Sequence, residues 1–211
     1  LRCLPKTAWP PTLIEPTTIA VQCCSRAELE SEDTVMIIGS GALGSSILRI
    51  VKLYNPKAII VTDIDDAKLE EAKKNGATYT INSLKEDVPA KAHELTDGYG
   101  PTVTIDAACV KGSLLTALQA TGNAGRVITM GFSVAPTEVN QFVITSKELD
   151  VRGSRLQNRK FQDVIDLVNE GKVDLRGSIS HTWNFEDAQA AFDFVDSRDP
   201  SYRKGVLTFK K

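Results

Sequence analysis

Three glycines spaced as G-x-G-x-x-G, from Gly39 to Gly44, form the segment of the sequence best suited to bind a ligand. They follow the apolar run 35–38 and lead into a stretch whose apolar residues recur at helical spacing. Such a turn lets a pyrophosphate approach the backbone, and the helix start offers unpaired N–H groups and a positive dipole end. The pattern therefore predicts a phosphate-binding turn. Its expected residues are Gly39, Gly41, Ala42, Leu43 and Gly44.

An acidic residue, Asp63, ends the next apolar run at the distance expected of a dinucleotide site. It follows Gly44 by 63 − 44 = 19 residues, where a carboxylate can accept hydrogen bonds from an adenosine ribose. A 2′-phosphate would be repelled by this charge, and no arginine directly follows to offset it. We therefore expect NAD(H) rather than NADP(H).

Two alternatives remain open on these residues alone. The glycines can simply close a strand-to-helix turn, with Asp63 as a solvated strand end. An S-adenosylmethionine site also uses a glycine-rich first turn and an acid after the second strand. The surrounding elements must decide between these alternatives.

The surrounding sequence alternates short β-branched runs with amphipathic stretches from residue 34 onward. This alternation predicts an α/β fold of the Rossmann type, a doubly wound parallel sheet covered by helices on both faces. The expected strands are 34–38, 58–63, 78–82, 102–106, 126–130 and 149–153, with a short further one at 139–143. The clearest expected helices are 42–54, 66–75, 110–121, 159–169 and 185–195.

The same pattern divides the chain into three parts. Residues 1–33 are expected to form a linker and a connecting helix, with the proline-rich stretch 1–16 extended and the helix within 17–30. Residues 34–176 are the expected Rossmann domain. In the return segment 177–211 the alternation breaks, and its strands are expected to find partners elsewhere.

Composition bears on partners and on the cellular compartment. The net charge is −2, with cations interspersed among acids, so no basic surface for nucleic acid is expected. The apolar runs are far shorter than the roughly 18 residues of a membrane helix, so no membrane association is expected. The four cysteines lack C-x-x-C spacing and fit a reducing cytoplasm. The chain does not open on methionine, and we expect it to be a fragment of a longer protein.

Short motifs spread over nearly the whole chain are more specific than the glycines alone. They are Leu13-Ile14-Glu15-Pro16, Asp33-Thr34-Val35, Lys73-Lys74-Asn75-Gly76-Ala77, Thr104-Ile105-Asp106-Ala107, Val127-Ile128-Thr129-Met130-Gly131 and Gly205-Val206-Leu207-Thr208-Phe209. With these motifs the chain resembles the coenzyme half of the zinc-type medium-chain dehydrogenases, which include alcohol, sorbitol and L-idonate dehydrogenases. Segments 105–109, 130–133, 146–149 and 153–156 most resemble bacterial polyol and sugar-acid dehydrogenases, the group of L-galactonate 5-dehydrogenase and the starvation-sensing proteins.

The resemblance implies coenzyme contacts beyond the glycine turn. Near the adenosine and the pyrophosphate it implies Lys68, Ala107, Ala108 and Lys204. Near the nicotinamide it implies Leu43, Met130, Gly131, Phe132, Ser154 and Leu156. Plain core packing for the apolar residues, and solvated surface charge for the two lysines, remain the alternatives.

The resemblance also implies zinc in the parent enzyme, where the metal acts as a Lewis acid on the substrate alcohol. The family draws its Cys and His-Glu ligands from an upstream GroES-like catalytic domain that nothing in this chain resembles. Glu15 is the one residue here expected near the zinc. His93 and His181 lack ligand spacing and are expected to be structural. No catalytic residue is therefore expected within this chain.

We thus expect the coenzyme-binding portion of an NAD(H)-dependent zinc dehydrogenase that acts on an alcohol, polyol or sugar acid and is inactive by itself. A homo-oligomer is expected, joined along the sheet edge through 139–143 and 149–153. The alternative is a non-catalytic nucleotide-binding or oligomerisation module derived from a dehydrogenase.

Overall fold

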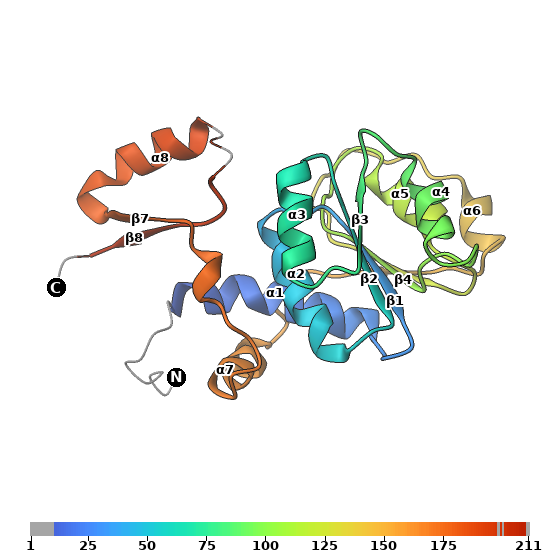
Figure 1. The fold of residues 1–211 in the computed structure, drawn as a ribbon, viewed down its shortest axis with the longest axis horizontal. Coiled ribbons are helices and arrows are strands. Elements are labelled where there is room, and N and C mark those ends of the chain that lie inside the picture. The colour runs from blue at the N-terminus through green and yellow to red at the C-terminus, as the bar shows by residue number, and fades with distance from the viewer. Residues whose placement is uncertain (1–10, 198, 200, 210–211) are drawn as a thin grey trace.

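A six-stranded parallel sheet forms the centre of the protein (Figure 1). The structure is a computed structural model, and it describes residues 11–197, 199 and 201–209. The strand order is β3-β2-β1-β4-β5-β6, the doubly wound order expected of a Rossmann fold. The strands are β1 (Thr34–Ile38), β2 (Ala58–Asp63), β3 (Tyr79–Asn82), β4 (Val103–Asp106), β5 (Arg126–Thr129) and β6 (Asp150–Gly153). The predicted fold class is confirmed.

Helices cover both faces of this sheet (Figure 1). Because strands covered on both sides must be apolar on both sides, β1 alternates its contacts: Val35 and Ile37 pack into one core, and Met36 and Ile38 into the other. The first core lies under α1 (Ile14–Ala27), α2 (Ala42–Val51), α3 (Asp66–Lys74) and α7 (Phe161–Asn169). The second lies under α4 (Val88–Glu94), α5 (Ser113–Ala120) and α6 (Gln141–Thr145).

A polar cluster fastens the end of α1 to the amino end of the sheet. Arg126 donates through Nη1 to the backbone oxygen of Ala27 at 2.8 Å and pairs through Nη2 with the buried carboxylate of Asp33. Thr102 Oγ1 donates to the same carboxylate at 2.7 Å. Buried charges are tolerated when they are paired in this way, and the cluster fixes α1 relative to β1, β4 and β5.

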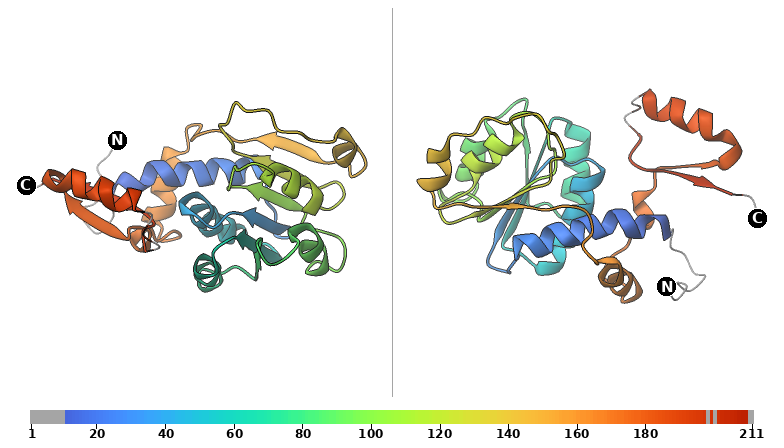
Figure 2. Two further views of the ribbon diagram at one scale, coloured as in Figure 1. Left: turned by 90° about the horizontal axis from the view of Figure 1, so that it is seen from above. Right: turned by 180° about the vertical axis from the view of Figure 1, so that it is seen from behind.

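The C-terminal unit lies to one side of the main sheet, near the N-terminal start of α1 (Figures 1 and 2). Its strands β7 (His181–Asn184) and β8 (Gly205–Thr208) pair with each other in parallel, joined by α8 (Ala188–Asp196). The prediction that these strands find partners elsewhere is therefore wrong within the described residues. A helical crossover brings the two segments side by side, as in any βαβ unit, and an aromatic cluster packs beneath α8. The cluster consists of His181, Trp183, Phe194 and Tyr202.

Two further expectations for local structure are wrong. Segment 139–143 is not a strand: residues Gln141–Thr145 form α6, because the Asn140 side chain caps it by accepting from the Phe142 N–H at 2.9 Å. The extended stretch expected up to residue 16 already turns at Pro11–Leu13, and α1 begins at Ile14. Pro16 fits there because the first turn of a helix needs no backbone donor. Residues 1–10 lie outside the described residues.

None of the helices in the described part of the chain is both long and apolar enough to cross a membrane.

Candidate coenzyme site

The glycine turn after β1 depends on close backbone contacts at two of its glycines. Gly39 has φ +94° and donates its N–H to the Thr62 oxygen at 2.8 Å. A Cβ on Gly44 would lie 1.8 Å from the Gly39 oxygen, so α2 can approach β1 only with glycine at this position. Gly39 and Gly44 therefore form the packed base of the turn: Gly39 allows the tight turn, and Gly44 allows the close packing of helix on strand.

Gly41 differs from these two glycines because the space around it is open. A Cβ built on Gly41 would meet no atom within 4 Å. Gly41 is also the N-cap of α2, and no side chain of the described residues caps the helix. The first N–H groups of α2, from Ala42 and Leu43 onward, have no partner inside the helix. The residues present thus fit the pyrophosphate of a dinucleotide: open space at Gly41, unpaired donors and a positive helix end.

Asp63, at the end of β2, is fixed against the glycine turn. Its Oδ2 accepts a hydrogen bond from the Ser40 N–H at 2.7 Å, and its Oδ1 accepts one from the Asp65 N–H at 3.1 Å. A carboxylate has about four acceptor positions, so two remain for ribose hydroxyls. The contact with Ser40 was not predicted, because spacing along the sequence does not show which backbone donor a carboxylate meets.

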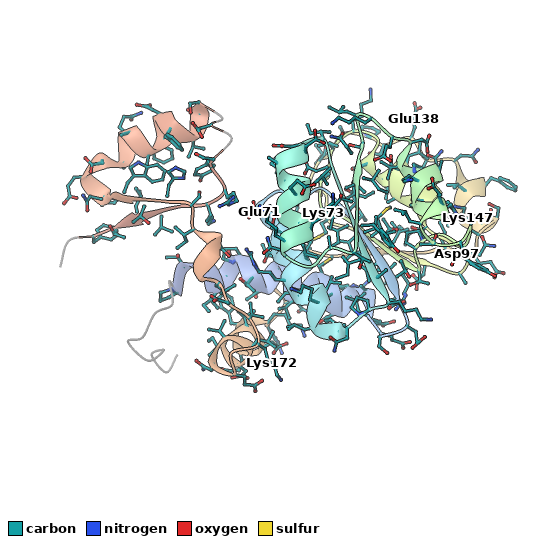
Figure 3. The ribbon with its side chains drawn as sticks, viewed as in Figure 1. Glu71, Lys73, Asp97, Glu138, Lys147 and Lys172 are labelled. Atoms are coloured by element: carbon teal, nitrogen blue, oxygen red, sulfur yellow. The ribbon has the colours of Figure 1, made fainter. Side chains whose placement is uncertain are left out.

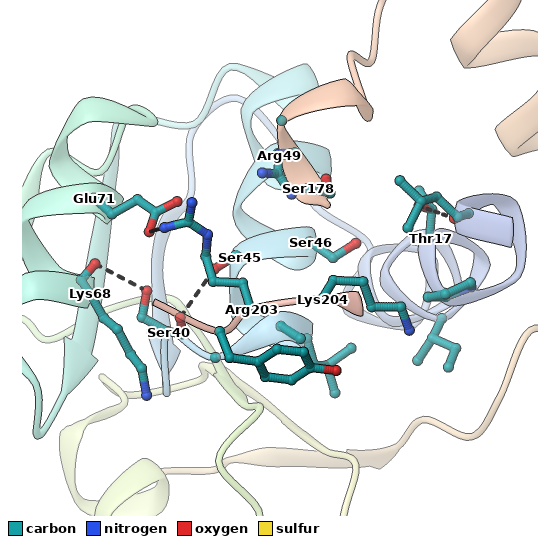
Figure 4. Close-up of a pocket in the computed structure, with 18 of the residues that line it drawn as sticks. Thr17, Ser40, Ser45, Ser46, Arg49, Lys68, Glu71, Ser178, Arg203 and Lys204 are labelled. Carbon is teal, nitrogen blue, oxygen red and sulfur yellow. Dashed lines mark hydrogen bonds and ion pairs between the residues drawn. The ribbon is translucent and has the colours of Figure 1, made fainter. Parts of the chain in front are cut away.

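A cavity of about 470 Å³ opens beside the turn (Figure 4). The N-terminal end of α2, part of α1, α3 and the C-terminal unit all contribute to its walls. Of the predicted contacts, it brings together Gly41, Ala42, Leu43, Lys68 and Lys204. The two predicted lysines, which are far apart in the sequence, thus line the same cavity as the phosphate-binding turn.

Arg203 is a cavity residue that the sequence did not reveal. Its Nη1 lies 2.8 Å from Oε2 of Glu71, which also lines the cavity, so an ion pair connects the C-terminal unit to α3 (Figure 4). Figure 3 shows Glu71 on the side of α3 that faces the C-terminal unit. Arg49 lines the cavity as well; burial lowers the pKa of its guanidinium, and the charge of Glu71 opposes this shift.

The loop after β4 carries the predicted residues Ala107 and Ala108. A Cβ on Gly39 would lie 3.1 Å from Ala108, so this loop contacts the glycine turn directly. Buried Asp106 holds the loop by accepting from Ser113 Oγ at 2.7 Å and from the Cys109 N–H at 3.0 Å. This anchoring by Asp106 was also missed, although an acid at the end of a strand is the signal that could have suggested it.

Of the residues expected near the nicotinamide, Leu43 lines the cavity, whereas the other five follow β5 and β6 and lie outside it. Met130 is buried, Gly131 is exposed, and Phe132 is 63% exposed. Ser154 is buried, and its hydroxyl has no hydrogen-bond partner among the described residues. Leu156 is exposed and has φ +50°. All five residues follow the carboxyl ends of β5 and β6. Because the strands are parallel, these residues lie at the same edge of the sheet as the glycine turn that follows β1.

The described residues do not fit a zinc site. Glu15 is exposed in the first turn of α1, and no group of three or more His, Cys, Asp or Glu residues in the described part of the chain is arranged to hold a metal. The ring of His93 contacts the oxygens of Gly98 and Gln119, and His181 stacks on Trp183. Both histidines have structural contacts.

A doubly wound parallel sheet in the order β3-β2-β1-β4-β5-β6, with an open glycine turn and an acid at the end of its second strand, is typical of dinucleotide-binding α/β proteins. Residues 42–170 match the family model described as zinc-binding dehydrogenase, and the chain belongs to this family. The family predicted from the sequence motifs is confirmed.

Individual relatives agree with this assignment. The chain is 36% identical over 200 residues to the starvation-sensing protein RspB of Escherichia coli K12, covering 94% of this chain and 58% of RspB. It is 27% identical over 184 residues to sorbitol dehydrogenase of Gallus gallus, covering 86% and 52%. The crystal structure of RspB from E. coli CFT073 in complex with NADH superposes with a TM-score of 0.89 at 35% identity, covering 98% of this chain and 61% of that one. The chain thus spans little more than half the length of these relatives.

Proposed function

We propose that this chain is the coenzyme-binding part of an NAD(H)-dependent dehydrogenase that acts on a polyol or a sugar acid. The observation that carries the proposal is the open space at Gly41, at the uncapped start of α2, beside a cavity lined by Lys68 and Lys204. Sorbitol dehydrogenase among the relatives and the NADH complex of RspB support it.

In this proposal the chain binds and orients the coenzyme. The pyrophosphate lies at the N-terminus of α2, where Lys204 adds positive charge and Lys68 lies toward the adenosine. Asp63 accepts from the adenosine ribose and repels a 2′-phosphate, which favours NAD(H). The residues after β5 and β6 border the nicotinamide. The nicotinamide supplies the hydride chemistry when it is bound.

The described residues do not form a zinc site, so the proposal assigns neither the metal nor the substrate pocket to them. The position of Glu15 near a zinc ion stays a prediction. The roles proposed for the residues of this chain do not require a metal. We also propose that two copies of the chain associate along β6, which is an edge strand of the sheet. The location we propose is a reducing cytoplasm, because Cys23, Cys24 and Cys109 are free thiols.

We propose that this chain binds the coenzyme and is inactive by itself. An assay of NADH binding and of turnover on the same preparation tests these two claims. NADH fluorescence is followed during titration with the chain, and NAD⁺-linked oxidation of sorbitol and of a sugar acid is then measured with added zinc. We expect binding without turnover. A folded chain that does not bind NADH overturns the coenzyme assignment, and turnover overturns the claim that this chain is inactive by itself.

A further inference from the structure

Arg155 and Phe132 form a cation–π pair at the carboxyl edge of the sheet. The guanidinium carbon of Arg155 lies 5.3 Å from the centre of the Phe132 ring, and both side chains are exposed. Phe132 follows β5 and Arg155 follows β6, and the two strands end level with each other because Thr129 pairs with Gly153. The pair therefore stands on the same edge of the sheet as the glycine turn.

Arg155 lies away from the phosphate-binding turn along this edge. In the strand order β1-β4-β5-β6, three strand spacings separate β1 from β6, which amounts to about 14 Å. The uncapped helix end and the lysines of the cavity are on the β1 side. An anion bound by Arg155 is therefore distinct from the coenzyme pyrophosphate, and it lies toward the nicotinamide in the proposed function.

Arg155 forms no ion pair with a carboxylate of the described residues. By contrast, Arg126, Arg152 and Arg203 each form an ion pair with an acidic side chain. Stacking on Phe132 leaves the N–H groups at the rim of a guanidinium available for a planar anion. The contact with Phe132 thus fixes the position of the Arg155 guanidinium, while its N–H groups have no carboxylate partner among the described residues.

The loop that follows Arg155 has an unusual backbone. Leu156, Asn158 and Arg159 have φ values of +50°, +29° and +65°, a region that residues other than glycine rarely adopt. Such conformations persist where the surrounding structure enforces them, and they concentrate at ligand sites. The observation supports a binding role for this loop in addition to the position of Arg155.

We propose that Arg155, held against Phe132, binds the carboxylate of the substrate and makes the enzyme prefer a sugar acid to the corresponding neutral polyol. This inference rests on the proposed function, because it assumes that the nicotinamide lies beside β5 and β6. A guanidinium matches a carboxylate with two parallel hydrogen bonds, whereas a hydroxyl of a polyol offers no charge. Phe132 fixes the plane of the guanidinium.

The test measures kcat/KM with NAD⁺ for an aldonate and for the alditol of the same carbon skeleton, using the dehydrogenase that contains this chain. Arg155→Gln is expected to lower kcat/KM for the aldonate by about tenfold or more, the usual size of a charge-assisted contact, and to change the alditol value less than twofold. Arg155→Lys should restore part of the loss. Lys172→Gln is the control for loss of a positive charge, since Lys172 is an exposed cation after the end of α7 that pairs with Glu170 at 2.7 Å, and it should leave the ratio of the two substrates unchanged.

NADH binding by the same proteins separates the two possible failures. If the parent enzyme does not bind NADH, the proposed function is overturned. If NADH binds and Arg155→Gln leaves the aldonate-to-alditol ratio unchanged, or lowers both rates equally, the role of Arg155 in substrate selection is overturned.

Discussion

The carboxylate of Asp63 accepts a hydrogen bond from the backbone N–H of Ser40 at 2.7 Å. This contact connects the end of β2 to the glycine turn that follows β1. Asp63 therefore has a structural role in the turn besides its proposed contact with the adenosine ribose. A substitution that removes the charge but keeps an acceptor oxygen separates the two roles.

Asp63→Asn is such a substitution. The amide oxygen can still accept from Ser40, and only the longer contact from the Asp65 N–H is lost, because the amide nitrogen cannot accept. We therefore expect the fold to be retained, while the repulsion of a 2′-phosphate disappears. The ratio of NADPH to NADH affinity should rise by about tenfold, which corresponds to about 1.4 kcal/mol. Fluorescence titration with both coenzymes measures this ratio. An unchanged ratio in a folded variant would show that Asp63 does not select the coenzyme.

Gly44 and Gly41 should respond differently to alanine. Gly44→Ala places a methyl group against the backbone oxygen of Gly39, at 1.8 Å in the present geometry, and should lower the free energy of unfolding by about 3 kcal/mol or more. Gly41→Ala meets no atom within 4 Å and should cost at most about 1 kcal/mol, as an altered N-cap does. Chemical denaturation of the two variants tests this contrast. Equal destabilisation would contradict the described packing of the turn.

Arg203 should matter for the coenzyme more than for stability. Its ion pair with Glu71 is half exposed, and such pairs stabilise a fold by about 1 kcal/mol at most. Arg203→Gln removes a cation from the cavity and should weaken NADH binding by about three- to tenfold. Glu71→Gln, which keeps the cation, is the matched variant and should weaken binding less. Equal binding by Arg203→Gln and the unaltered chain would exclude Arg203 from the coenzyme site.

Cys23 makes stability sensitive to alkaline pH. Burial, and to a smaller extent the nearby Cys109, raises the pKa of the Cys23 thiol from 9.0 to about 12. The folded state therefore keeps a proton that the unfolded state loses above pH 9. The stabilising contribution is complete below pH 9 and is lost progressively as the pH rises toward 12, by up to about 1.4 kcal/mol per pH unit.

Urea denaturation at pH 8, 9 and 10 measures this dependence. Cys23→Ala leaves a small cavity and lowers stability at every pH, so the informative quantity is the slope of the unfolding free energy against pH. The slope should be less steep in Cys23→Ala than in the unaltered chain. Parallel slopes would show that the Cys23 thiol is not the group that titrates.

The sheet was predictable because local sequence determines it. Runs such as Val35 to Ile38 are apolar on both faces, and only a strand covered on both sides buries them all. The glycine turn was predictable for the same reason, since Gly39 and Gly44 are required by contacts within one strand–turn–helix segment.

Contacts between distant segments were not predictable in this way. Arg203 and Glu71 are separated by 132 residues, and their pairing depends on where the C-terminal unit lies beside α3. Segment 139–143 was misassigned because its apolar residues suited a strand, whereas the cap from Asn140 starts a helix one residue later. The features that the sequence pattern did not predict thus depend largely on side-chain caps and on ion pairs between distant segments.

Coenzyme binding at the start of α2 is the central claim, and calorimetric titration of NADH into the chain tests it most directly. Gly41→Val is the matched variant, because its side chain enters space that is open in the structure and that the pyrophosphate would occupy. We predict saturable binding of one NADH per unaltered chain and no detectable binding by Gly41→Val, with the same circular dichroism spectrum for both. Absence of binding by the folded unaltered chain, or equal binding by the variant, would contradict the account.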